Sequence, residues 1–365
     1  MRLFFLIFLL LFIISCQNKE PQKNIRCRNH YANHFSVSLN QDSSYTIKVI
    51  NPYQGSLNDT FTYYLSHKKN KSNAIHIPIK KVAIFSTTYI GFLDALNELS
   101  SIIAISGTNQ IYNTKLVNRI SQGHIFETGF ENSINYEKLA SSKPDVVFIY
   151  SVGKENMPYV EKIKSLGIPI FYIAEFMEDS PLGRAEWIKF FGFFFQKSMI
   201  ADSIFQEIEN QYDSIKQIAQ SLQIHPTVFL NIPYQGIWYM PEGNAYMANL
   251  IKDAGGNYLY QKTRGNQILK FDFEKALTDA INADIWLNPG LIKTKKELYE
   301  NDQRYSLFKA YKNSAIFNQT LRMNPMGGND FWENGVVNPH LILEDLYHIF
   351  KNDTNFTFHF YQKLK

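Results

Sequence analysis

The chain has 365 residues, of which 45% are hydrophobic and 15% aromatic. This is more than one hydrophobic core usually holds, so the length predicts two domains. The net charge of +4 is spread along the sequence without long basic runs, a pattern that gives no support to a nucleic-acid partner.

The N-terminus has the pattern of a lipoprotein signal peptide. Residues 1–15 contain an apolar run, Leu3 to Ile14, which ends at Ser15 directly before Cys16. The run is too short for the roughly 20 residues that cross a bilayer as a helix, and a small residue before cysteine fits lipoprotein cleavage. We expect Cys16 to become the lipidated N-terminus, the alternative being an ordinary signal peptide with an incidental cysteine. Only Cys27 then remains, so we expect no intramolecular disulfide and no cysteine-based metal cluster.

The next two segments are predicted to be a tether and a small sheet. Residues 16–34 begin with a polar stretch that is typical of a flexible tether. In residues 35–79 apolar and polar residues alternate, as in Phe35-Val37-Leu39 and Tyr45-Ile47-Val49, with turn-forming residues between the runs. This N-terminal β-strand segment is expected to form short antiparallel strands.

Residues 80–196 predict an N-terminal α/β lobe. Short buried strands are expected at 81–85, 102–105, 145–150 and 168–173, with a helix at 89–99. Strands that alternate with helices indicate a parallel sheet that is covered on both faces.

One long helix and a second α/β lobe follow. In residues 197–223 the apolar positions recur every three or four residues, which predicts an amphipathic helix of roughly 36 Å, long enough to bridge two lobes. Residues 224–365 predict a C-terminal α/β lobe and a closing helix. Its expected strands are 227–232, 283–288 and 315–317, and its expected helices are 245–254 and 339–350.

A short pattern occurs once in each half. Asn135–Leu139 leads through a helix to Asp145, and Asp272–Leu277 leads through a helix to Asp284. Either the two lobes share a repeated unit and face each other across a cleft, or these are two unrelated helix starts, where acidic residues are favoured by the helix dipole.

The predicted fold class is therefore α/β, with two lobes that are each a parallel-sheet, Rossmann-like α/β sandwich, joined by one long helix and preceded by the short β segment. Residues 80–350 resemble the iron-siderophore and vitamin B12 periplasmic-binding protein family, whose members are substrate-binding proteins of ABC importers. The motifs behind this resemblance are Phe85-Ser86-Thr87-Thr88, the runs 135–147 and 164–169, and Leu250 with Ala254-Gly255-Gly256-Asn257. Residues 181–187, 238–241 and 327–332 are similar to a lipoprotein branch common in Bacteroidetes.

In two-lobe binding proteins the ligand lies at the ends of the parallel strands, where loops of both lobes meet. Arg184 and Arg264 are candidates to meet carboxylate or catecholate charge. Each aromatic residue has core packing as its alternative, although glycines beside Trp238 and Trp332 predict loops there. The candidate ligand-binding residues are Thr87, Thr88, Tyr89, Gln110, Tyr150, Arg184, Trp238, Tyr239, Arg264, Asn329 and Trp332.

The resemblance implies the function. We expect a monomeric protein of the cell envelope, anchored by its lipid to a membrane facing the periplasm. It is expected to bind a ferric siderophore or related metal chelate in the interlobe cleft and to deliver it to an ABC permease dimer. Cobalamin or haem is the alternative ligand. Glu137 and Glu274 match the two exposed acids that the family pairs with permease arginines.

Other site chemistries have less support in the sequence. His124, His225 and His340 are isolated from one another, so direct metal coordination is not expected. No common hydrolase or nucleotide-binding motif is found, so neither enzymatic activity nor a cofactor is expected, although a cell-envelope lipoprotein hydrolase remains the rival class.

Overall fold

The computed structural model describes residues 25–27, 29–69, 71–130, 133–151, 153 and 157–365. Cys16 and the predicted signal peptide lie outside these residues. No helix in the described part of the chain is long and apolar enough to cross a membrane.

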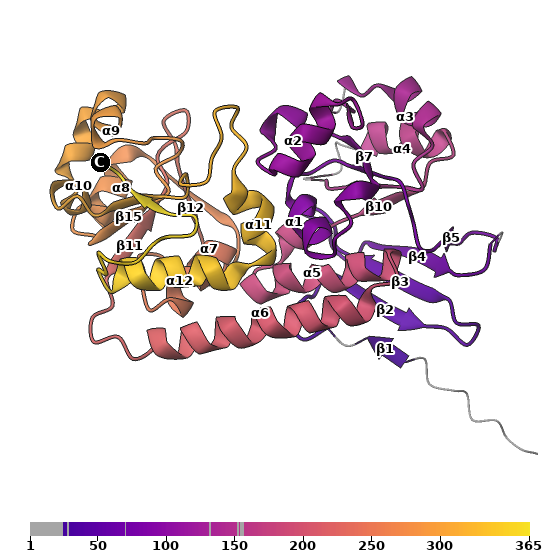
Figure 1. Cartoon of the computed structure of the whole chain (residues 1–365). Helices are drawn as coiled ribbons and strands as arrows, with labels where there is room; N and C mark the ends of the chain where they lie inside the picture. Colours follow the sequence, from indigo (N-terminus) through magenta and orange to yellow (C-terminus); the bar gives the residue numbers. More distant parts are fainter. Residues whose placement is uncertain (1–24, 28, 70, 131–132, 152, 154–156) are drawn as a thin grey trace, which may run out of the picture.

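The N-terminal segment forms a five-stranded sheet (Figure 1). Its strands, in spatial and chain order, are β1 (Ile25–Cys27), β2 (Phe35–Leu39), β3 (Tyr45–Ile50), β4 (Thr60–Ser66) and β5 (Ile75–His76). β1 to β4 pair antiparallel, whereas β5 lies parallel to β4. Alternate residues of β2 and β3 are buried, as the alternating sequence predicts.

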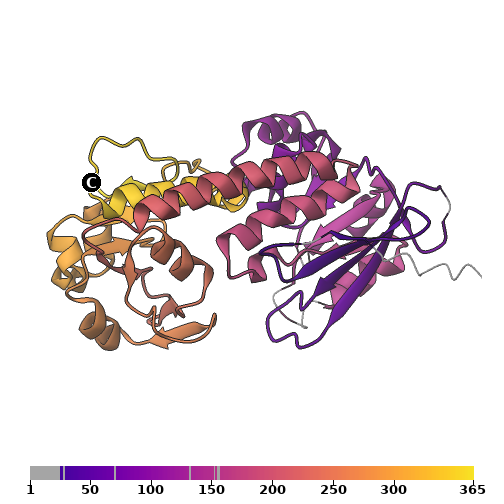
Figure 2. The same cartoon turned by 90° about the horizontal axis from the view of Figure 1, so that it is seen from below.

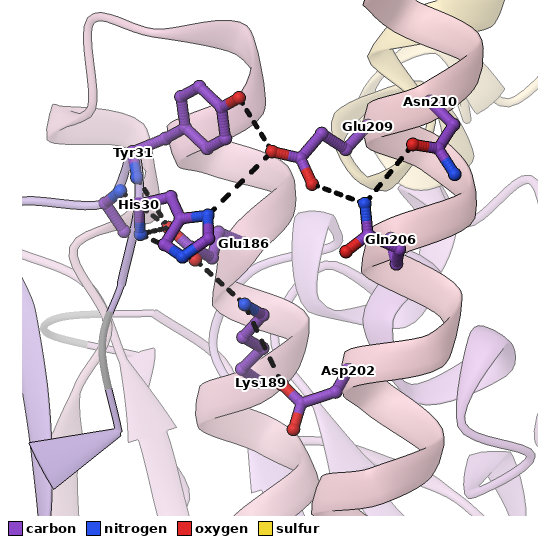
Figure 3. Close-up of polar contacts among 9 residues, drawn as sticks. His30, Tyr31, Glu186, Lys189, Asp202, Gln206, Glu209 and Asn210 are labelled. Carbon is purple, nitrogen blue, oxygen red and sulfur yellow. Dashed lines mark hydrogen bonds and ion pairs between the residues drawn. The ribbon is translucent and has the colours of Figure 1, made fainter.

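The predicted tether is too long, because its second half is part of the folded body. β1 pairs with β2, and residues 30–32 bind the buried helix α5 (Pro181–Phe194) (Figure 3). The backbone N–H groups of His30, Tyr31 and Ala32 donate to the Glu186 carboxylate at 2.8–3.1 Å. A carboxylate without solvent contact requires such donors, so the fold stabilises this segment although its sequence is polar. We call residues 29–34 the N-terminal strap.

The first lobe contains a fully parallel sheet in the order β10-β9-β6-β7-β8. Every residue of β6 and β9 is buried, as expected for a sheet covered on both faces. The strands are β6 (Val82–Ile84), β7 (Ile102–Ile105), β8 (Phe126–Glu127), β9 (Val146–Ile149) and β10 (Ile170–Tyr172). The helices between them are α1 (Thr88–Ala95), α2 (Thr114–Ser121), α3 (Tyr136–Ser142) and α4 (Met157–Ser165).

Helix α5 lies between the N-terminal sheet and the first lobe. Trp187 packs on Phe35 of the N-terminal sheet, with ring centroids 4.7 Å apart. Phe191 and Phe194 pack edge-on against Phe148 of β9 at 5.3 and 5.1 Å. Since nearly all of α5 is apolar and buried, the two sheets share one core through it.

The long helix α6 (Ser198–Ala219) follows α5 and precedes the second lobe. It packs against α5 and against the final helix α12 (Pro339–Phe350), and in both views it extends along both lobes (Figures 1 and 2). Its 22 residues correspond to roughly 33 Å of helix.

The second lobe has a mixed sheet in the order β13-β11-β15-β16-β17. Its parallel strands are β13 (Asn257–Tyr258), β11 (Thr227–Leu230), β15 (Ile285–Leu287) and β16 (Ile316–Asn318), and β17 (Gln362–Lys363) is an antiparallel edge strand. A separate antiparallel pair consists of β12 (Trp238–Pro241) and β14 (Ile268–Phe271). The helices are α7 (Tyr246–Asp253), α8 (Phe273–Ala280), α9 (Lys295–Asn301), α10 (Lys309–Lys312) and α11 (Asp330–Val337).

The lobes also contact each other directly, because α11 follows the last parallel strand of the second lobe but packs on α1 of the first. A Cβ atom added to Gly91 would lie 2.1 Å from the Glu333 carbonyl oxygen, so the two helices touch through their backbones. The Glu333 carboxylate accepts hydrogen bonds from the N–H groups of Tyr112 and Asn113. Asn324 donates its side-chain amide to the Ile111 carbonyl at 2.7 Å.

A second contact between the lobes lies near the start of α5. The Arg184 guanidinium stacks over the Tyr246 ring, 3.9 Å from its centroid. The side-chain amides of Asn249 and Asn266 donate to the backbone carbonyl and the carboxylate of Asp179, respectively. These two contacts join the lobes in addition to α6.

Candidate functional site

A cavity of about 710 Å³ opens at the carboxyl ends of the parallel strands of the first lobe. The loops after β6, β7, β8 and β9 contribute all of its described walls, in agreement with the rule that ligands bind at this edge of an α/β sheet. The lining residues are Phe85, Ser86, Thr87, Ser106, Gly107, Thr108, Asn109, Gln110, Glu127, Gly129, Phe130, Ser133 and Tyr150.

Glu127, at the end of β8, holds two of these loops together. Its carboxylate accepts hydrogen bonds from the N–H groups of Gly107, Thr108 and Gly129 and from the Thr108 hydroxyl, at 2.7–3.1 Å. Partial burial opposes ionisation, but the four donors outweigh it and hold the pKa of Glu127 below its usual value. Glu127 therefore gives the described part of the cavity wall a fixed negative charge at neutral pH.

Aromatic rings form the apolar part of the wall. Phe130 and Tyr150 lie nearly parallel, with ring centroids 6.0 Å apart. Phe85 is stacked on Tyr159 at 6.4 Å. Hydroxyl and amide groups on the loops after β6 and β7 provide the polar part, so the cavity combines flat apolar surfaces with neutral hydrogen-bonding groups.

Three of the predicted ligand-binding residues, Thr87, Gln110 and Tyr150, line this cavity. Thr88 lies beside Thr87 in the same loop, and its hydroxyl donates to Glu175 at 2.6 Å. Tyr89 is fully buried and packs against Phe191 at 5.8 Å, so its ring belongs to the core. Helix α1 begins at Thr88, and its geometry directs the side chain of Tyr89 into the core. Residue types alone do not reveal this direction.

The two predicted arginines are not in the cavity. Arg184 donates to the carbonyl oxygens of Phe176 and Glu178 at 2.9 and 3.1 Å and forms the stacked contact with Tyr246. Its role in this structure is to join the lobes. Arg264 is exposed on the second lobe.

Trp238 was predicted to lie in a loop, and this prediction is wrong. Its ring is completely buried among Phe229, Trp286 and Phe308, and its indole N–H donates to the Leu230 carbonyl at 2.8 Å. The irregular backbone around Gly236 ends where β12 begins, and the strand directs Trp238 inward. Tyr239, the next residue of the strand, is half-buried on the opposite face.

The last two predicted residues lie at the start of α11. Asn329 caps this helix by accepting from the Phe331 N–H at 3.0 Å, and it donates to the Gln319 carbonyl. The structure thus gives it a structural role. Trp332 is 39% exposed and packs edge-on against Phe331.

Glu137 and Glu274 occupy equivalent positions in the two lobes. Each is exposed in the first turn of its helix, α3 or α8. The N-cap residues Asn135 and Asp272 each accept from the N–H three residues later. Glu274 also faces Arg304, with 3.6 Å between the charged groups.

The end of the repeated pattern is equivalent as well. The Asp145 carboxylate accepts from the N–H groups of Lys80 and Lys81, just before the first parallel strand of lobe one. The Asp284 carboxylate accepts from the Thr227 N–H, at the start of the first strand of lobe two. The internal similarity of the sequence thus corresponds to one structural unit that occurs in both lobes.

Sequence reasoning missed Glu127 and Phe130. The strand before them, β8, has two residues and therefore shows no alternation. The available signal was Gly129 itself, because a glycine soon after the apolar pair Ile125-Phe126 favours a turn, and its φ of +77° in the structure agrees with this. The described residues contain no group of three or more His, Cys, Asp or Glu side chains that could hold a metal ion.

Two α/β lobes beside a long helix, with a cavity at the strand ends, define the class of solute-binding proteins. A sequence model of the family described as "Periplasmic binding protein" matches residues 82–320, which is more than half of the chain. The chain belongs to this family, whose members bind solutes rather than catalyse reactions.

Solved structures of low sequence identity share the fold. A periplasmic binding protein of Veillonella parvula superposes with a TM-score of 0.61 at 13% identity, over 83% of this chain and 97% of that one. A periplasmic heme binding protein of Pseudomonas aeruginosa gives 0.58 at 12% identity, over 79% and 98%. A protein of an ABC-type Fe3+-hydroxamate transport system from Saccharomonospora viridis gives 0.56 at 14% identity, over 80% and 96%.

Two relatives of Methanocaldococcus jannaschii, both named uncharacterized lipoproteins, are similar in sequence. One is 28% identical over 281 residues, which cover 74% of this chain and 65% of the relative. The other is 28% identical over 261 residues, which cover 67% and 64%. The aligned part of this chain thus spans slightly less than two thirds of each relative.

Proposed function

We propose that this protein is the substrate-binding component of an ABC importer and that it captures a ferric siderophore or related metal chelate. The observation that carries the proposal is the first-lobe cavity at the strand ends, in a chain of the periplasmic binding protein family. The cavity has the size of a small-molecule site and combines aromatic rings with hydroxyl and amide groups. Such walls suit a rigid chelate with an apolar body and a polar rim.

A spectroscopic titration tests this proposal. Purified protein without its signal peptide would be incubated with ferrioxamine B, ferric enterobactin, haem and cyanocobalamin and then separated from free ligand by gel filtration. The absorption spectrum of the protein fraction identifies any coloured ligand that stays bound. The proposal requires that at least one iron chelate co-elutes at equimolar amount. Retention of haem or cyanocobalamin alone would support the alternative ligand, and retention of none would refute a chelate-binding role.

We further infer that the mature protein is attached to a membrane through Cys16 and docks on the permease through Glu137 and Glu274. Relatives named lipoproteins and the family membership support this arrangement. Cys16→Ala is expected to move the protein from the membrane fraction to the soluble fraction. Unchanged fractionation would exclude lipidation as the attachment.

A further inference from the structure

The charges at the cavity restrict the kind of chelate that it accepts. Among the described residues that line it, Glu127 is the one charged side chain, and the others are aromatic rings, hydroxyls, amides and glycines. The Glu127 carboxylate is itself exposed and already accepts four hydrogen bonds from its own loops. Its geometry is thus fixed before a ligand arrives.

Neither of the two arginines that the sequence suggested as ligand contacts lines the described walls of the cavity. Arg184 is held by two backbone carbonyls and the Tyr246 ring, and the carboxyl groups of Glu175, Glu178 and Asp179 lie near it. Arg264 is not among the lining residues. A multiply charged anion in the cavity would therefore lose its hydration without gaining a cationic partner on the described walls, and it would face Glu127.

From these observations we infer that the cavity selects neutral or cationic chelates and rejects multiply anionic ones, with Glu127 as the specificity-determining residue. This inference rests on the proposed function. It specifies the ligands as ferric complexes of the hydroxamate type rather than ferric tris-catecholates. Hydroxamate oxygens and amide groups on the rim of such a complex can accept from the neutral donors of Thr87, Asn109 and Gln110. Opposite charges attract and like charges repel most strongly at short range in a partly desolvated site, so the charge of the ligand decides its affinity.

The test compares two chelates of opposite charge on the full mature chain. Ferrioxamine B is a monocationic ferric tris-hydroxamate, and ferric enterobactin is a trianionic ferric tris-catecholate. Their Kd values would be measured by tryptophan fluorescence quenching at low and at high ionic strength. We expect ferrioxamine B to bind at least about tenfold more tightly at low salt, with a smaller difference at high salt, because ions screen the charge contribution.

A charge added to the wall provides the matched variant. Gln110→Lys introduces a cation without removing any hydrogen bond of Glu127, whereas Glu127→Gln would disturb the loops that the carboxylate holds. Gln110→Lys is expected to shift the Kd ratio of the two chelates by about tenfold towards ferric enterobactin. Gln122→Lys, an exposed position at the end of α2 that is not part of the cavity lining, should leave the ratio unchanged.

The outcomes separate the two proposals. Equal or tighter binding of ferric enterobactin by the unmodified protein would overturn the charge selection and leave chelate binding intact. A Kd ratio that does not respond to Gln110→Lys would also overturn it, because the charges of this cavity would then not decide the selection. Failure of both chelates, together with haem and cyanocobalamin, would remove the proposed function itself.

Discussion

Buried carboxylates join segments of this protein that are far apart in the sequence. Glu186 binds the N-terminal strap, and Glu333 binds the first lobe from a helix of the second. Both side chains are completely buried, and both accept backbone N–H groups. A buried acceptor that loses its donors, or donors that lose their acceptor, costs much more free energy than a surface contact. Single residues therefore control how the parts of the molecule are held together.

The first prediction concerns Glu186. Replacing it with Ala leaves the N–H groups of residues 30–32 without their acceptor and removes the nearer of the two carboxylates that pair with Lys189. We expect Glu186→Ala to lower the free energy of unfolding by about 3 kcal/mol. Urea denaturation followed by circular dichroism measures this change. Glu207→Ala, at an exposed position of α6, is the control and should change stability by less than about 0.5 kcal/mol. A loss of similar size in the two variants would contradict the role of Glu186.

A second prediction follows from the ionisation of Glu333. Burial raises its pKa to about 7, although the N–H groups of Tyr112 and Asn113 oppose the shift. In the unfolded chain the carboxyl titrates near pH 4.5. Between pH 4.5 and 7 the folded protein therefore keeps a proton on Glu333 that the unfolded chain has lost. The contribution of Glu333 to stability is thus fully present below pH 4.5 and is lost as the pH rises towards 7.

Glu333→Gln removes this titration, so the stability of the variant relative to the unmodified protein should rise with pH. We expect a relative gain of about 3 kcal/mol between pH 4.5 and 7.5, on top of a pH-independent offset from the altered hydrogen bonds. Urea denaturation of both proteins at several pH values gives the difference directly. The difference also cancels the opposite contribution of His340, whose pKa burial lowers to about 4. A difference that stays constant with pH would show that Glu333 ionises normally.

At the scale of elements, three helices connect the parts of the molecule in different ways. α5 joins the N-terminal sheet to the first lobe through aromatic packing, and α6 packs along both α5 and α12. α11 contacts α1 so closely that backbone atoms meet at Gly91. Close backbone contact leaves no room for adjustment, because protein interiors are packed as densely as crystals.

The third prediction is that Gly91→Ala destabilises the contact between α1 and α11. The added methyl group would overlap the Glu333 carbonyl, and a rigid backbone can relieve this only by moving the helix. We expect a loss of about 2–3 kcal/mol in chemical denaturation, despite the higher helix propensity of alanine. Gly335→Ala in α11 is the matched control, because its new Cβ would meet the flexible end of Ile342 at 3.1 Å. Similar effects of the two substitutions would argue against the close helix contact.

The whole molecule is a pseudo-symmetric body with one exposed acid in the same position of each lobe. Glu137 and Glu274 are both in the first turn of a helix that precedes a parallel strand. Two negative charges at a fixed distance on an elongated protein can each pair with one of two positive charges on a symmetric partner. The direct contacts between lobes hold the spacing of these acids, which favours docking as a rigid unit.

The fourth prediction tests this docking. The double variant Glu137→Lys with Glu274→Lys is expected to keep its stability and its chelate affinity while losing uptake in cells and association with the permease, because both docking charges are reversed. The control reverses two other exposed acids, Glu161 and Glu300, and should retain uptake. Normal uptake by the first variant would exclude these residues from docking, and loss of chelate binding would place them in the ligand site.

The sequence by itself determined the features that depend on local pattern. Alternation predicted the N-terminal sheet, buried apolar runs predicted the strands of three or four residues in both lobe sheets, and helical periodicity predicted α6, because these patterns arise within a short stretch of chain. The two-residue edge strands β8, β13 and β17 are too short to show such a pattern and were not predicted. The resemblance of motifs led to the correct family. The repeated helix start around Glu137 and Glu274 was also visible, since its capping residues are adjacent in sequence.

Only the tertiary structure decided where individual side chains face. Trp238 and Tyr89 carry residue types that suit a ligand wall, but their strand and helix direct them into the core. Arg184 was expected at the ligand and instead joins the lobes. Glu127 became a candidate because the loops after β7 and β8 converge on its carboxylate, and convergence of distant segments leaves no trace in a local pattern. The polar strap is ordered for the same reason, since its donors find Glu186 more than 150 residues further along the chain.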